Sequence, residues 1–173
     1  GEPVIRQALI QAMRILGRQF VMGRTIAEAL ERSRAAEADG YRHSFDMLGE
    51  AARTAADAKR YFDAYAAAID AIGDGATGDD VFARPSISVK LSALHPRFEY
   101  AQQDRVIDEL APRLLALARR AMDHGIGFTV DAEEADRLEP SLDVIEAVYG
   151  DPALGGWEGF GVALQTYQKR APQ

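Results

Sequence analysis

The chain has 173 residues, 47% of them hydrophobic, which is enough to build one packed domain. Its net charge of −7 comes from 27 acidic and 20 scattered basic side chains, a pattern that argues against nucleic-acid binding by this segment. The absence of cysteine excludes disulfides and thiolate metal sites, and no apolar run approaches the ~20 residues that span a bilayer. We therefore expect a cytoplasmic protein with one domain or part of one.

Helical patterns dominate the first part of the chain. Apolar side chains recur at helical spacing over residues 4–22, and Thr25 followed by Glu28 has the form of a capping box. That box predicts the start of a second helix, which we expect over residues 26–38. The sequence thus predicts a helical lead-in segment over residues 1–40.

From residue 41 onward, short alternating runs are separated by longer helical patterns, which is the rhythm of a parallel α/β sheet. The expected strands cover residues 42–48, 87–94, 126–132 and 161–167. The expected helices between them cover residues 55–72, 103–124 and 141–149. Pro112 lies inside the second of these helices and predicts a kink or a break there.

Alternation along the expected strands separates two faces with different chemistry. One face is apolar and suited to packing under helices: Phe45, Met47, Ile87, Val89, Leu91, Ile126, Phe128, Val130, Val162 and Leu164. The other face is mostly polar: Ser44, Asp46, Ser88, Lys90, Ser92, Thr129, Asp131, Ala163 and Gln165. In parallel barrels, catalytic groups sit at the carboxyl ends of the strands. The candidate site residues that meet this positional test are Asp46, Lys90, Asp131 and Gln165.

Two other interpretations of these residues stay open. Buried charges are often paired for structural reasons, so the polar face could simply close the top of the core. The carboxylates from Asp131 to Asp136 could hold a divalent cation for a metal-dependent barrel enzyme, but no inward histidine accompanies them and we expect no metal. His95 follows the second strand, and we interpret it as a loop-stabilising residue and not as a general base.

Four motifs resemble the proline dehydrogenase domain of the bifunctional bacterial proline utilization A enzymes. They are YRHSFDMLGEA (residues 41–51), SISVKLSALHPRFE (86–99), VDAEEADR (130–137) and LQTYQKRAP (164–172). The lead-in EPVIRQALIQAMRILGRQFVMGRTIAEAL resembles the helical segment that precedes that domain. The similarity is ordered and covers most of the chain.

The resemblance implies an α/β fold in which residues 41–173 form the N-terminal half, the first four βα units, of a (β/α)₈ TIM-like barrel. It implies FAD as cofactor and oxidation of L-proline to Δ1-pyrroline-5-carboxylate, with hydride transfer to flavin N5. Electrons would pass to a quinone at the membrane, where a cytoplasmic enzyme would be peripheral at the inner membrane during turnover.

Roles for individual residues also follow from the resemblance. Lys90 would be catalytic and would help to hold the substrate carboxylate, with Asp46 and Glu50 at the substrate mouth. Asp131 would be catalytic and would lie beside the flavin and Lys90. The other cofactor-binding residues would be Ala132, Ala163 and Gln165. The arginine that the family pairs with Glu50 lies beyond this chain.

The family's barrel continues through four further βα units. We therefore expect the chain to be a fragment of a longer polypeptide that associates with the missing barrel half. Exposed sheet edges favour such pairing. A non-enzymatic interpretation also stays open, in which the chain is a folded fragment or assembly module without flavin.

Overall fold

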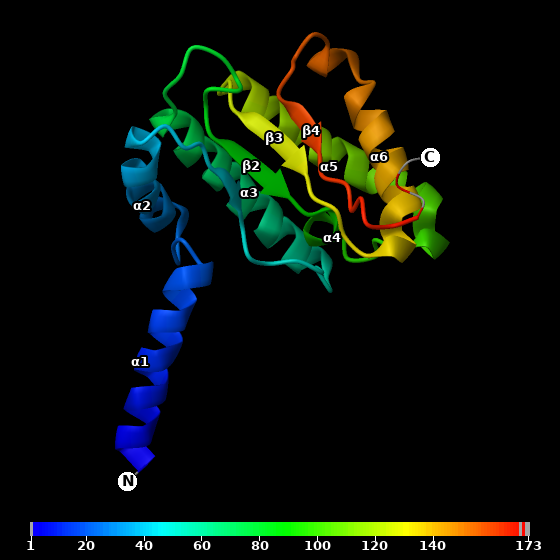
Figure 1. Ribbon diagram of the computed structural model, residues 1–173. Helices are drawn as coiled ribbons and strands as arrows, with labels where there is room; N and C mark the ends of the chain where they lie inside the picture. Colours follow the sequence, from blue (N-terminus) through cyan, green and yellow to red (C-terminus); the bar gives the residue numbers. More distant parts are fainter. Residues whose placement is uncertain (1, 170, 172–173) are drawn as a thin grey trace. The chain divides into compact units, whose positions relative to one another are not determined.

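The computed structural model describes residues 2–169 and residue 171 (Figure 1). The chain divides into two compact units, Gly1–Arg42 and His43–Gln173. In the described part, no helix is both long and apolar enough to cross a membrane. The second unit holds the sheet and all the expected site residues.

The first unit consists of two helices, α1 (Glu2–Phe20) and α2 (Ile26–Ala38). The expected capping box at α2 is half present, because Thr25 Oγ1 accepts from Glu28 N at 3.2 Å. The Glu28 carboxylate reaches past Thr25 and accepts from Arg24 N at 3.0 Å. Both helices that the apolar spacing and the cap predict are therefore formed.

The second unit is built on four parallel strands in the order β1-β2-β3-β4, as the α/β rhythm predicts. The strands are β1 (Ser44–Asp46), β2 (Ser86–Val89), β3 (Gly127–Val130) and β4 (Phe160–Val162). The pairing aligns Asp46 with Ser88, Ser88 with Thr129, and Thr129 with Gly161. This alignment brings the carboxyl ends of all four strands to one edge of the sheet.

The strands are shorter than the sequence predicts, and the largest error concerns the end of the second one. Residues expected to extend that strand form a helical turn, α4 (Leu91–Leu94), which begins where Ala93 N donates to the Lys90 carbonyl at 3.2 Å. Ser92, expected on the polar face of a strand, is buried in this turn. After β4 the chain also leaves the sheet early, since Gln168 N donates to the Gln165 carbonyl in a turn.

Three long helices, α3 (Ala55–Gly75), α5 (Gln103–Asp123) and α6 (Leu138–Tyr149), lie along one side of the sheet (Figure 1). Short 3₁₀ turns, η1 (Tyr100–Gln102), η2 (Ala135–Arg137) and η3 (Pro152–Leu154), flank them. The predicted break at Pro112 is wrong, because α5 runs through it. Pro112 and Asp108, whose carbonyl loses its helical donor, are both exposed, so water can satisfy that carbonyl.

The predicted apolar face forms the core under these helices. Its members in β1, β2 and β3 are at most 6% exposed: Phe45, Ile87, Val89, Phe128 and Val130. At β4 the cover is incomplete, and Val162 and Leu164 are 41% and 57% exposed. The opposite face stays accessible within this unit, where Ser44 and Asp46 are exposed and Lys90 is half-buried. The polar face is thus the one that can meet a ligand or another part of a protein.

The N-terminus of α3 carries a complete capping box. Thr54 Oγ1 accepts from Asp57 N at 3.1 Å, and Asp57 Oδ2 accepts from Thr54 N at 3.1 Å. Thr54→Ala leaves the Asp57 amide without its acceptor, so we expect the free energy of unfolding to fall by about 1 kcal/mol. Urea unfolding followed by circular dichroism measures this difference. The control Thr77→Ala, in an exposed loop, should change nothing; equal losses in both variants would contradict the capping role.

Candidate active site

The Lys90 ammonium lies between two carboxylates at the carboxyl edge of the sheet. Lys90 Nζ donates to Asp46 Oδ1 at 2.8 Å and Oδ2 at 2.9 Å, and it lies 2.8 Å from Asp131 Oδ2. Asp46 ends β1, Lys90 follows β2, and Asp131 follows β3. The parallel register therefore assembles three of the four residues that the alternation places on one face.

Burial and the neighbouring charges shift the pKa of Lys90 in opposite directions. The Lys90 side chain is only 14% exposed. Burial lowers the pKa of the ammonium, but the hydrogen bonds to Asp131 and Asp46 outweigh it and raise the pKa well above its ordinary value. Lys90 is therefore a fixed cation at neutral pH. A charge held in this way suits recognition of an anionic group.

Asp131 is held from both sides of its carboxylate. Its Oδ1 accepts from Ala132 N at 3.0 Å while its Oδ2 meets Lys90 Nζ. The Asp131 backbone amide continues the sheet by donating to the Val89 carbonyl at 2.9 Å. The position of this carboxylate is thus determined by backbone as well as side-chain contacts.

Sequence reasoning missed a buried network beside this cluster. Glu133 accepts from the Ser92 amide at 2.9 Å and from the Ser92 hydroxyl, and its side chain is 6% exposed. Ser92 Oγ in turn accepts from Ala51 N at 3.0 Å, and Ala51 adopts the left-handed φ of 56°, which is uncommon for a residue other than glycine. The network joins the segments that follow β1, β2 and β3. The signal available in the sequence was the position of Glu133, two residues after Asp131.

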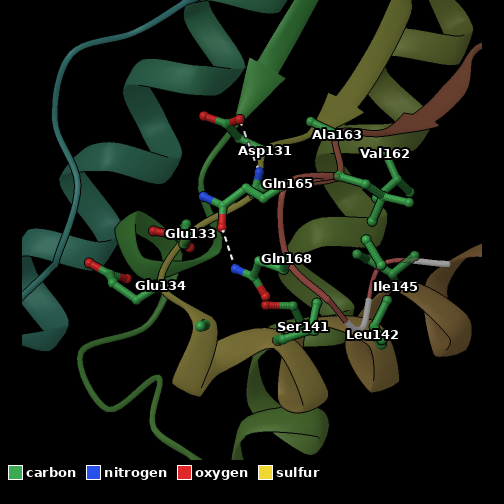
Figure 2. Close-up of a pocket in the computed structure, with 15 residues that line it drawn as sticks. Asp131, Glu133, Glu134, Ser141, Leu142, Ile145, Val162, Ala163, Gln165 and Gln168 are labelled. Atoms are coloured by element: carbon green, nitrogen blue, oxygen red, sulfur yellow. Dashed lines mark hydrogen bonds between the residues drawn. The ribbon is translucent and has the colours of Figure 1, made fainter. Parts of the chain in front are cut away.

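A hollow opens next to the ion cluster, at the ends of β3 and β4 (Figure 2). It has a volume of about 190 Å³. The expected cofactor-binding residues all line it: Asp131, Ala132, Ala163 and Gln165. Apolar side chains from α6 and β4, among them Leu142, Ile145 and Val162, form its other wall. The hollow thus combines a charged rim with an apolar floor.

Gln165 presents an unpaired donor at this hollow. Its Oε1 accepts from Gln168 Nε2 at 2.9 Å (Figure 2). The same oxygen accepts from the Tyr167 hydroxyl at 3.3 Å. Among the residues that the structure describes, no acceptor bonds to Gln165 Nε2. The backbone beside it is fixed, since Ala163 N donates to the Val130 carbonyl at 2.9 Å.

Glu50 lies farther out, as its expected place at the mouth requires. Its side chain is exposed and lines a second hollow, of about 440 Å³, together with Lys90, Glu133 and Gln165. Among the arginines whose side chains the structure describes, none forms an ion pair with Glu50. The structure therefore groups Asp46, Lys90 and Asp131 by direct contact and places Glu50 at their periphery.

His95 is buried away from the ion cluster. Its Nδ1 accepts from Arg97 N at 3.1 Å, and its Nε2 lies 3.1 Å from Glu109 Oε2. Both ring nitrogens are thus engaged in tying the loop after α4 to α5. These contacts support the loop-stabilising role.

The carboxylates considered for a metal point to different partners. Asp131 pairs with Lys90, Glu133 bonds to Ser92, and Glu134 lies 3.1 Å from Arg137 Nη1. Within the described residues, no three side chains of the metal-binding types converge on one point. The geometry of these carboxylates therefore gives no support to the metal-dependent alternative.

The buried Glu133 carboxyl predicts a specific dependence of stability on pH. Burial raises its pKa against the opposing hydrogen bonds from Ser92. The folded protein thus binds this proton more tightly than the unfolded chain, and the stabilisation is full at low pH and lost as the pH rises through the folded-state pKa. Glu133→Gln cannot titrate at this position, so the free energy of unfolding of the variant relative to wild type should rise as the pH increases above about 4.3, the ordinary pKa of a glutamate in an unfolded chain.

Urea unfolding at several pH values measures this difference. Glu158→Gln serves as the control, because Glu158 is exposed in a loop and should show a flat difference. A flat difference for Glu133→Gln as well would mean that burial does not raise the pKa of this carboxyl.

Comparisons of the sequence with known proteins all point to proline dehydrogenases. The sequence model of the family described as "Proline dehydrogenase" matches residues 29–173. The bifunctional protein PutA of Escherichia coli (strain K12) is 54% identical over 172 residues, which cover 99% of this chain and 13% of that protein. The proline dehydrogenase of Deinococcus radiodurans is 28% identical over 169 residues, which cover 98% of this chain and 50% of that protein.

Solved structures agree. A proline utilization A (PutA) mutant from Bradyrhizobium japonicum superposes with a TM-score of 0.81 at 60% identity, covering 99% of this chain and 17% of that one. A PutA from Bdellovibrio bacteriovorus, inactivated by N-propargylglycine, has a TM-score of 0.88 at 21% identity, which shows the shared fold. The chain thus spans 13–18% of the length of these PutA proteins and half of the Deinococcus radiodurans proline dehydrogenase. On the family match and these identities, the chain belongs to the proline dehydrogenase family.

Proposed function

We propose that this chain forms one wall of a proline dehydrogenase active site, which oxidises L-proline to Δ1-pyrroline-5-carboxylate with FAD as cofactor. The observation that carries the proposal is the Lys90 ammonium, fixed by Asp46 and Asp131 at the carboxyl edge of a parallel sheet. This is the edge at which barrel enzymes place their catalytic groups. The family membership of the chain supplies the reaction.

The barrel itself is part of the proposal. The four strands run parallel, their helices cover one face, and their polar face is left accessible. In a closed barrel such a face points inward, and the edge strands β1 and β4 pair with further strands. We infer that residues 41–173 are the first half of a (β/α)₈ barrel in a longer chain, that residues 1–40 lead into it, and that the remaining half completes it.

The residues at the hollow fit a flavin. Gln165 offers an unpaired amide donor, the Ala132 and Ala163 side chains are small enough for close approach, and Asp131 is a fixed acceptor. The hollow of about 190 Å³ is smaller than the pockets of roughly 300–1,000 Å³ that usually hold small ligands. These residues therefore hold one side of the cofactor, and the rest of the chain encloses it.

Once bound, FAD supplies a hydride acceptor at N5. The Gln165 amide would donate to the bound cofactor and stabilise negative charge on its reduced form. Asp131 would keep Lys90 charged and in place. Ala132 and Ala163 leave the hollow open. These residues would bind and orient the cofactor and the substrate.

Lys90 has the capacity to bind the substrate carboxylate. An ammonium has three N–H donors, and two oxygens of Asp46 and one of Asp131 already lie within hydrogen-bond distance of it. The carboxylate of proline would therefore take the place of one of the two Asp46 contacts. With two carboxylates against one ammonium, the cluster is net negative, so we infer that further cations come from the other half of the barrel. We infer that Glu50, which is exposed and lines a hollow together with Lys90, pairs with one of them.

Turnover also requires an acceptor for the electrons of the reduced flavin. We infer that electrons pass to a quinone, so that a cytoplasmic enzyme meets the inner membrane as a peripheral protein during turnover. The exposed polar edge of the sheet is compatible with such an exchange, because the hollow opens to solvent at the site.

Substitution of the central ion cluster tests the assignment. In the complete enzyme, we expect Lys90→Ala and Asp131→Ala each to lower kcat/KM for proline by about 10²-fold or more, since each removes a fixed charge at the reacting centre. Steady-state kinetics per bound flavin measures the effect. Lys59→Ala on the outside of α3 and Asp79→Ala in an exposed loop are the matched controls. Wild-type kinetics in both site variants would refute these roles.

A further inference from the structure

The backbone amide of Lys90 lacks a partner in the sheet. Towards β1, the amides of β2 donate at every second residue, as Ser86 N does to the His43 carbonyl at 3.0 Å. Lys90 N points to the same side, but β1 ends at Asp46, before the corresponding carbonyl would be reached. The amide donates instead to the Tyr65 hydroxyl oxygen at 3.2 Å.

Tyr65 reaches this amide from a different layer of the fold. It lies on α3, is 1% exposed, and belongs to the buried face that also carries Ile69 and Ile72. Burial raises the pKa of its hydroxyl to about 12, so it stays a neutral acceptor at physiological pH. A buried amide without an acceptor is costly, and Tyr65 removes that cost at the point where the ladder ends.

Lys90 connects the end of β2 to the first residue of α4. The Val89 carbonyl before it accepts from Asp131 N at 2.9 Å, and its own carbonyl accepts from Ala93 N at 3.2 Å. The Tyr65 contact is the remaining anchor of this short stretch. Because these contacts determine where the Lys90 Cα lies, they also determine where its ammonium can lie.

We propose that Tyr65 is a positioning residue: by holding the Lys90 amide, it sets the ammonium between Asp46 and Asp131 and so determines the affinity of the site for the substrate carboxylate. The inference rests on the proposed role of Lys90 in binding that carboxylate. It adds a residue from the helix layer, behind the sheet, to the groups on which substrate binding depends.

Tyr65→Phe in the complete enzyme tests the proposal, because it keeps the ring and removes only the hydroxyl. A displaced ammonium weakens binding of the carboxylate, so we expect KM for proline to rise about tenfold while kcat stays within about twofold. Bound flavin per chain should be unchanged. Tyr100→Phe, at a 58% exposed tyrosine, is the matched control and should leave both constants as they are.

A rise in KM at nearly constant kcat distinguishes a positioning role of Tyr65 from a general loss of stability. A variant that was merely less stable would show less active enzyme with an unchanged KM, and that result would overturn the proposal. If the wild-type enzyme oxidises proline and Lys90→Ala impairs it, but Tyr65→Phe behaves as wild type, the inference on Tyr65 fails and the proposed function stands. If wild type does not oxidise proline, the proposed function fails.

Hydrogen exchange gives a second readout that does not depend on activity. In the full-length wild-type enzyme, the Lys90 amide should exchange slowly, and in Tyr65→Phe about tenfold faster, because its acceptor is gone. Mass spectrometry with single-residue fragmentation resolves this amide. Fast exchange in wild type would overturn the proposal even if the variant could not be produced. An unchanged rate in the variant would overturn it as well.

Discussion

One partly buried cation organises the polar side of this molecule. The Lys90 side chain is only 14% exposed, and a charge in such a place is stabilised when opposite charges meet it directly. Asp46 and Asp131 do so at 2.8 Å each, from the strands on either side of β2. The contact therefore requires three parallel strands in the observed register, and a shift by one residue would turn each side chain to the opposite face.

The rest of the second unit supports this edge of the sheet. The core face packs under α3, α5 and α6 and keeps the strands in register (Figure 1). The Ser92 and Glu133 network ties the chain segments beyond β1, β2 and β3 to one another. Tyr65 adds a contact from the helix layer to the backbone of Lys90. The positions of Lys90, Asp46 and Asp131 on the polar face thus depend on the packing of the apolar face against the helices.

The sequence predicted those features of the fold that depend on the alternation and spacing of apolar and polar residues. The two faces of the strands, the Thr25 cap of α2 and the grouping of Asp46, Lys90 and Asp131 follow from residue order. Residue order does not predict the strand ends, the α4 turn or the continuity of α5. The first two depend on where the neighbouring strand stops pairing, and the third depends on whether water can reach the carbonyl that Pro112 leaves without a donor. The contact of Tyr65 with Lys90 joins residues 25 positions apart and carries no local signal. Motif resemblance, and not periodicity, led to the family.

The most direct test of a flavin site built around Lys90 is the visible spectrum of the full-length protein during anaerobic titration with L-proline. We expect the absorbance of bound, oxidised flavin, which proline bleaches in the wild-type enzyme, and a much weaker response to proline when Lys90 is replaced by alanine. A colourless protein, or a flavin spectrum that proline leaves unchanged, would contradict the proposed function.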